Sequence, residues 1–157
     1  MRVDIEFLEQ KILGIVQNNF ATKIAEINSE KGDSLLENID SSYYYNDLYV
    51  SELNTDLFIF YGIKDPVIDS IGGDSAEEWT IFYNIFIHKQ NELTLIRNSI
   101  LRYTRALKEI VQENVEDIQQ YSCNLAELSA VEPQDVEDII NETPYKMGGI
   151  EFKIKIA

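Results

Sequence analysis

The chain has 157 residues, of which 45% are hydrophobic and 26% are charged. This length fits a single domain over residues 1–157, and the composition is that of a folded protein with a real core rather than a disordered chain. Asp and Glu number 28 against 13 Lys and Arg, which gives a formal net charge of −15. Such a chain is repelled by phosphate backbones and anionic lipid, so the charge disfavours nucleic-acid binding and membrane-surface binding.

The sequence carries one cysteine, Cys123, and therefore cannot form an internal disulfide. No apolar run approaches the roughly 20 residues that a membrane-spanning helix needs. The start, MRVDIEFLEQ, is acidic within four residues and lacks the basic-then-apolar order of a signal peptide. We expect synthesis in a reducing cytoplasm and no contact with a membrane.

The first segment is predicted to be a helix. Apolar residues recur at helical spacing from Ile5 to Ile27. The sequence NNF at 18–20 is a candidate interruption of this helix. Gly32, in EKGDS, is suited to end it in a left-handed conformation.

A change in residue composition after this helix indicates strands. The stretches 43–50 and 56–63 are rich in aromatic and β-branched residues, and 77–89 alternates over its whole length. The alternation places Trp79, Ile81, Tyr83, Ile85 and Ile87 on one face of the last strand, while the other face is mixed. The segment 64–78 contains Pro66 and a Gly-Gly pair, which predicts a loop.

A long helix is predicted over 91–115, with Asn91 as N-cap and an apolar stripe of Leu93, Ile96, Ile100, Leu101 or Tyr103, Leu107, Ile110 and Val111. The same helix carries the chain's one local basic feature, Arg97, Arg102, Arg105 and Lys108. Alternation slightly favours a strand over 119–131, and 132–142 is ambiguous. The stretch 148–157 alternates cleanly as a closing strand, and we interpret Gly148 and Gly149 as a turn into it.

These elements predict an α+β fold. It consists of one mixed, mostly antiparallel sheet, flanked by an N-terminal helix and a long central helix.

No catalytic signature occurs in the chain. GxSxG, HExxH and CxxC are absent, and neither Gly-Gly pair belongs to a phosphate-binding motif. His88, the single histidine, is more readily a surface residue at a strand end than a catalytic or metal-binding group. Cys123 is more readily a small buried residue than a nucleophile. We therefore expect no enzymatic activity, no cofactor and no metal site.

Two acidic segments are candidate contact surfaces. Within 64–78, Asp65, Asp69, Asp74 and Glu77 can form either a weak divalent-cation site or, as we favour, a solvated acidic surface. Within 132–142, the carboxylates Asp135, Glu137 and Asp138 can be paired acids and bases or an exposed acidic edge. The pattern contains no sign of burial, which favours the exposed edge.

The tyrosine run Tyr43, Tyr44, Tyr45 and Tyr49 has three possible uses. Base stacking requires a basic groove, but the nearby charges are Asp40, Asp47 and Glu52. Core packing and a subunit interface remain open, because tyrosine suits apolar surfaces that end in a hydroxyl. Strand alternation places Tyr43 and Tyr45 on one face and Tyr44 on the other.

The order of phrases resembles one family. KIAEIN (23–28), the tyrosine segment, LFIFYGI (57–63), LRYTRALKEI (101–110) and the closing GGIEFKIKIA (148–157) are similar to the tail terminator proteins of long-tailed bacteriophages. The resemblance spans nearly the whole chain as a pattern of elements, with no single diagnostic motif. It implies a small α/β subunit without catalytic residues, which forms a ring, usually a hexamer, in the neck region of the virion.

The resemblance also implies partners. The ring caps the growing tail tube, ends polymerisation of the tube protein, and presents a surface to head–tail connector or neck proteins. DNA passes through such a ring without specific binding, and the two acidic segments are expected to face its lumen or the head-side partner. Alternatives are a head-completion or neck protein and, in a different class, an acidic DNA-mimic binding module.

Overall fold

A computed structural model describes residues 3–46, 56–69, 76–88, 93–137 and 144–156. In chain order these ranges hold α1 (Ile5–Lys31), the 3-10 helix η1 (Ser41–Tyr43), β1 (Tyr44–Tyr45), β2 (Leu57–Asp69), β3 (Ala76–His88), α2 (Leu93–Glu113), α3 (Val115–Gln119), β4 (Cys123–Glu137) and β5 (Pro144–Ile156).

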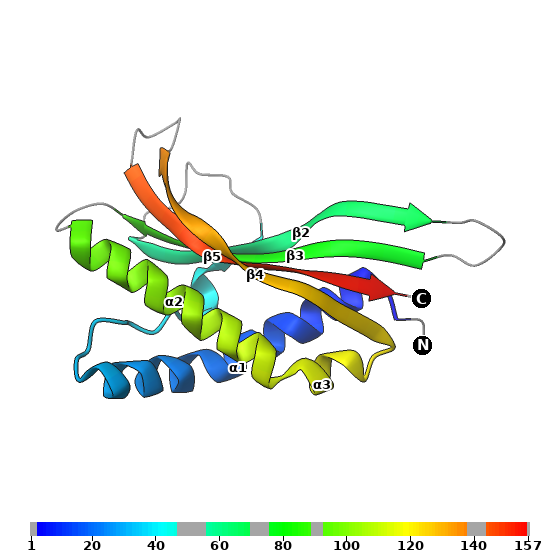
Figure 1. Ribbon diagram of the computed structural model, residues 1–157, viewed down its shortest axis with the longest axis horizontal. Helices are drawn as coiled ribbons and strands as arrows, with labels where there is room; N and C mark the ends of the chain where they lie inside the picture. The colour runs from blue at the N-terminus through cyan, green and yellow to red at the C-terminus, as the bar shows by residue number, and fades with distance from the viewer. Residues whose placement is uncertain (1–2, 47–55, 70–75, 89–92, 138–143, 157) are drawn as a thin grey trace.

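The strands form one five-stranded sheet in the order β1-β2-β3-β5-β4. Strands β2, β3, β5 and β4 pair antiparallel, and the two-residue β1 pairs parallel to β2. Figure 1 shows α1 and α2 together beneath one face of this sheet. The predicted α+β fold, with a mixed sheet, an N-terminal helix and a long central helix, is confirmed.

The end of α1 at Gly32 is the end that the sequence predicts, and the structure adds a capping interaction at its start. The Asp4 side chain accepts a hydrogen bond from the Phe7 amide at 2.9 Å, and Gly32 ends the helix at φ 70°. The proposed interruption at 18–20 is wrong, since the helix is continuous to Lys31. Asn19 donates its side-chain amide to the Ile15 carbonyl at 2.7 Å, and Phe20 stays on the buried stripe.

The loop predicted over 64–78 is also wrong in part. β2 continues through Pro66 to Asp69, and β3 begins at Ala76. The register shifts between Lys64 and Val67, with Asp65 at φ 52°, which describes a bulge. Within the described residues β1 opposes only Ile59 and Phe60, so this part of β2 is a sheet edge, where proline is tolerated.

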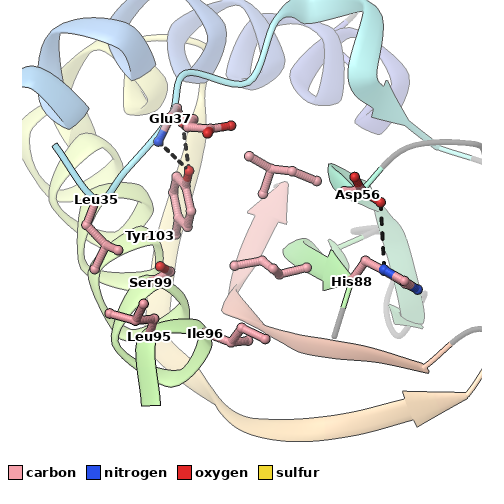
Figure 2. A pocket seen from close by; sticks show the side chains of 10 residues that line it. Leu35, Glu37, Asp56, His88, Leu95, Ile96, Ser99 and Tyr103 are labelled. Atoms are coloured by element: carbon pink, nitrogen blue, oxygen red, sulfur yellow. Dashed lines mark hydrogen bonds and ion pairs between the residues drawn. The ribbon is translucent and has the colours of Figure 1, made fainter. Parts of the chain in front are cut away.

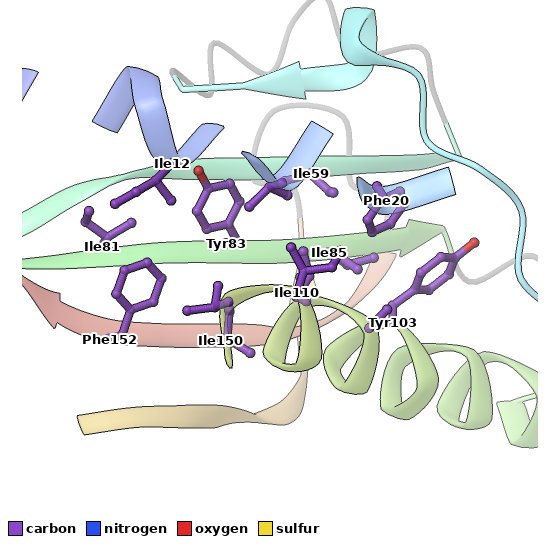
Figure 3. Close-up of a cluster of buried hydrophobic side chains, with 14 of the residues drawn as sticks. Ile12, Phe20, Ile59, Ile81, Tyr83, Ile85, Tyr103, Ile110, Ile150 and Phe152 are labelled. Atoms are coloured by element: carbon purple, nitrogen blue, oxygen red, sulfur yellow. The ribbon is translucent and has the colours of Figure 1, made fainter. Parts of the chain in front are cut away.

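The core lies between the sheet and the two helices. Figure 3 shows Ile81, Tyr83 and Ile85 of β3 facing side chains of α1, α2 and β5. This confirms the face predicted for β3, because Trp79 and Ile87 also pack against the same cluster. On α2, Tyr103 is buried whereas Leu101 is 41% exposed, which resolves the alternative left open by the apolar stripe.

Two side chains connect α1 and the following segment to α2. The buried Lys23 ammonium lies 2.7 Å from Glu113 Oε1 and 3.1 Å from Glu26 Oε2. Burial lowers the Lys23 pKa, but these hydrogen bonds outweigh it and the pKa is raised above its usual value. The Tyr103 hydroxyl donates to the Glu37 carbonyl at 2.7 Å and accepts from the Glu37 amide at 2.8 Å.

Gly148 and Gly149 lie inside β5 and do not form the predicted turn. A Cβ at Gly148 would overlap Ile100 Cγ2, and a Cβ at Gly149 would overlap the Tyr83 carbonyl oxygen. Both glycines are therefore explained by close approach of a helix and of the neighbouring strand.

The last third contains more strand than helix. The strand favoured over 119–131 is confirmed from Cys123 onward, whereas Gln119 is the last residue of α3 and 120–122 form a turn. β4 continues through the first part of the ambiguous acidic stretch to Glu137. It is the other edge of the sheet, and its pairing with β5 shifts register after Ala126 and after Val131. Bulges and exposed acids such as Glu127 and Glu132 are features that discourage edge-to-edge pairing.

Candidate interaction surfaces

The tyrosine segment divides between two sides of the sheet. Tyr44 is 9% exposed and meets Phe20 edge-on at a centroid distance of 6.3 Å. Tyr45 contacts Phe58 on the opposite face at 5.7 Å. Tyr43 lies in η1 and is 43% exposed. Core packing thus explains Tyr44, and Tyr43 is the described tyrosine most open to another subunit; Tyr49 lies outside the described residues.

The hydroxyl of Tyr44 is buried without a hydrogen-bond partner among the described residues. Burial raises its pKa above the usual value, so the group stays neutral. The hydroxyl of Tyr83, in the centre of the core, is also buried without a hydrogen-bond partner among the described residues, and burial raises its pKa strongly. These tyrosines serve as large apolar side chains, and neither presents its hydroxyl to a ligand.

A second apolar cluster covers the sheet face opposite the helices. Phe58 and Phe86 stack at 4.9 Å with an interplanar angle of 3°, and Tyr145 and Met147 complete the buried set. Tyr45 packs against this set. The mixed second face of β3 signalled this cover, but the sequence did not identify the residues of β5 that supply it.

His88 lies at the end of β3 beside a pocket of about 330 Å³. Figure 2 shows the pocket between α2, the segment around Glu37, the start of β2 and the end of β3; Leu35, Leu95, Ile96 and Ser99 also line it. His88 Nδ1 is 3.7 Å from Asp56 Oδ1, and the histidine side chain is half-buried rather than exposed. No group of three His, Cys, Asp or Glu side chains in the described ranges can hold a metal ion.

Cys123 is buried at the start of β4, as expected from the sequence. Its sulfur contacts the Ile118 carbonyl oxygen at 3.3 Å. Burial raises the pKa of the thiol, which disfavours the thiolate that a nucleophile needs.

The two acidic segments lie at opposite ends of the sheet. Asp65 is exposed near the end of β2, and Glu77 is in β3 opposite Ile156 of β5. Asp135 pairs with Lys146 at the other end, and its carboxylate contacts that ammonium at 3.1 Å. Asp69 and Glu137 are the last residues of β2 and β4. Asp74 and Asp138 lie outside the described residues.

Residues 64–68 form an exposed stretch, which we call the β2 tip. All five of these residues are exposed, including Val67 at 58% and Ile68 at 64%. Consecutive strand residues point to opposite faces, so exposure of both aliphatic side chains means that both faces of the tip are uncovered. Sequence reasoning missed this surface because it assigned the segment to a loop.

A second surface, the α2 patch, is a hollow of about 320 Å³ lined by Lys31, Asn98, Leu101, Arg102 and Arg105. Arg102 Nη1 lies 2.8 Å from Asp33 Oδ2, and Arg105 pairs with Glu30 and Glu109. The hydrogen bond from Arg102 lowers the Asp33 pKa. Two of the four basic residues predicted for this helix, Arg102 and Arg105, thus line a hollow that contains one exposed leucine.

The described residues contain no helix with the length and apolar character needed to cross a membrane. Comparison of the sequence with protein-family models and with curated proteins gives no match.

Proposed function

We propose that this chain is a tail terminator subunit, which forms a ring on the tail tube of a long-tailed bacteriophage and ends its polymerisation. The observation that carries this function is the coexistence of an exposed aliphatic surface, the β2 tip, and a basic hollow around an exposed leucine, the α2 patch, on a strongly acidic chain. In a monomer with net charge −15, the exposed side chains of Val67, Ile68 and Leu101 contribute no stability, because they remain in water. Contiguous exposed apolar side chains mark contact sites, and Val67 and Ile68 are such a pair.

The sequence resemblance and the fold support the same function. The phrases that carry the resemblance fall on α1, β2, α2 and β5, which are the main elements around the core. The negative charge suits a conduit through which DNA passes without being held. Asp65 and Asp135 lie at opposite ends of the sheet, so the two acidic segments occupy separate surfaces of the subunit.

Polymerisation of the cognate tail tube protein provides the test. We expect tubes grown with this protein to stop at a defined length, and tubes grown without it to continue, as measured by electron microscopy. Tubes of normal length that fail to join heads when the protein is missing would favour the neck alternative. If tube lengths are unaltered and the protein competes with duplex DNA for binding to a basic protein, the proposed function is wrong and a DNA-mimic function is favoured.

A further inference from the structure

We infer that the β2 tip of one copy docks on the α2 patch of the next, so that the ring is built from a single head-to-tail contact. The inference rests on the proposed function, because it requires copies of the chain to assemble. It names the residues that make the contact: Val67 and Ile68 on the tip, and Leu101 with its cationic neighbours on the patch.

The β2 tip is the far end of the paired strands β2 and β3. The register shifts between Lys64 and Val67, and beyond this bulge Val67 and Ile68 remain paired with Glu78 and Glu77 of β3. Val67 and Ile68 are the two most exposed large hydrophobic residues described in the chain. Burial of apolar surface is worth about 25 cal/mol per Å², so covering two such side chains gives each contact a useful driving force.

The α2 patch offers a receiving surface of matching chemistry. Its hollow is lined by Leu101, which is 41% exposed, and by Arg102 and Arg105. Long basic side chains cover apolar surface with their stems while their charged ends remain in water. An aliphatic tip that enters this hollow therefore meets apolar atoms at its centre and charge at its rim.

Charge identifies the occupant as a second copy of the chain. At and around the tip the carboxylates Asp65, Glu77, Glu78 and Glu151 outnumber the cations Lys64 and Lys153, which pair with Glu151 and Glu78, so this end of the strands is acidic. Lys31, Arg102 and Arg105 line the patch, and the exposed Arg97 lies one helical turn before Leu101. The nearby carboxylates Glu30, Asp33 and Glu109 pair with the two lining arginines. Most other contacts between copies with net charge −15 are repulsive, so the patch is where an acidic tip is tolerated best.

The two surfaces lie at opposite ends of the molecule. Val67 pairs with Glu78 near the start of β3, whereas the first half of α2 lies beside His88 at the end of β3. Figure 1 shows the end of β2 on one side and, on the other, the end of α1 and the start of α2. Complementary surfaces at opposite ends make a heterologous contact, which closes into a ring when the rotation between copies permits.

Two variants test this contact by complementation. The tip variant V67D/I68D retains the patch, and the patch variant L101D retains the tip. We expect each variant alone to remain at the 18.1 kDa chain mass under conditions in which the wild type assembles. We expect an equimolar mixture to form a dimer of twice that mass and nothing larger, because one intact tip meets one intact patch. Sedimentation velocity at rising concentration measures all three samples.

The matched control is L95D, which places the same charge on another exposed leucine of α2, outside the patch. It should assemble as the wild type does, and far-UV circular dichroism should show all variants folded. If the wild type assembles and the tip and patch variants assemble equally well, the inference is wrong while the ring stands. A symmetric dimer of either single variant also overturns it. A wild type that stays monomeric at every concentration removes both the ring and this contact.

Discussion

Replacing Gly149 by alanine is expected to abolish stable folding. The new Cβ would overlap the carbonyl oxygen of Tyr83 in the neighbouring strand, and Gly149 has φ 157°, which L-residues rarely adopt. The Cβ would be fixed to the backbone of β5 and would clash with the backbone of β3, where these two strands pair. Neither strand can move away without breaking the pairing between them. We expect a loss above about 4 kcal/mol, a large share of the roughly 5–15 kcal/mol that stabilises a typical domain. Urea unfolding followed by circular dichroism measures it.

Gly14→Ala is the matched control for this substitution. Gly14 lies inside α1, and a Cβ there would meet nothing within 4 Å. Alanine in a helix interior is favoured over glycine by roughly 0.5–1 kcal/mol, so this variant should be slightly more stable than the wild type. Equal stabilities for the two alanine variants would contradict the close approach of β3 and β5 at Gly149.

Truncating Phe20 to alanine is expected to cost about 3–5 kcal/mol of unfolding free energy. Phe20 is 1% exposed and joins three parts of the chain: α1, the tyrosine segment and α2. Its ring stacks on Tyr103 at 6.1 Å with an interplanar angle of 7°, and it meets Tyr44 edge-on. The cavity left behind would lie between elements that cannot all close on it. Denaturant unfolding provides the measurement.

Tyr44→Phe is the control in the same cluster. The Tyr44 hydroxyl has no hydrogen-bond partner among the described residues, so its removal takes away a buried polar group without breaking a bond. Stability should be unchanged or raised. A loss of several kcal/mol in Tyr44→Phe, or a cost below about 1 kcal/mol in Phe20→Ala, would show that the cluster is packed differently.

Periodic patterns and caps made most of the fold predictable. The stripes on α1 and α2, the alternation in β3, and the end of α1 at Gly32 depend on neighbours only a few residues away. The interruption at 18–20 failed for a related reason, because the propensity of two asparagines is weaker than the burial of Phe20 on the same stripe.

The remaining errors share a tertiary cause. A proline such as Pro66 predicts the end of a strand when only the neighbouring sequence is considered. It is tolerated here because this part of β2 is at the edge of the described sheet. Gly148 and Gly149 resemble a turn in sequence, but the constraint on them comes from Ile100 and Tyr83, which lie far away along the chain.

The candidate surfaces were less predictable than the fold. The tyrosine run drew attention as a group, but pairing with β2 sends Tyr44 into the core and Tyr45 to the opposite face. The β2 tip carries a short aliphatic pair without any motif, and only the strand assignment shows both side chains uncovered. The sequence did mark the basic side of α2, although the exposure of Leu101 at its centre required the orientation of the helix.

The native mass of the purified protein tests the central claim, self-assembly into a ring, most directly. Multi-angle light scattering should be performed at low and at high salt, because salt screens the repulsion between acidic subunits. We predict a single closed oligomer, most simply a hexamer, whose mass does not grow with concentration once it has formed. A constant mass of 18.1 kDa at every salt and protein concentration would contradict the account.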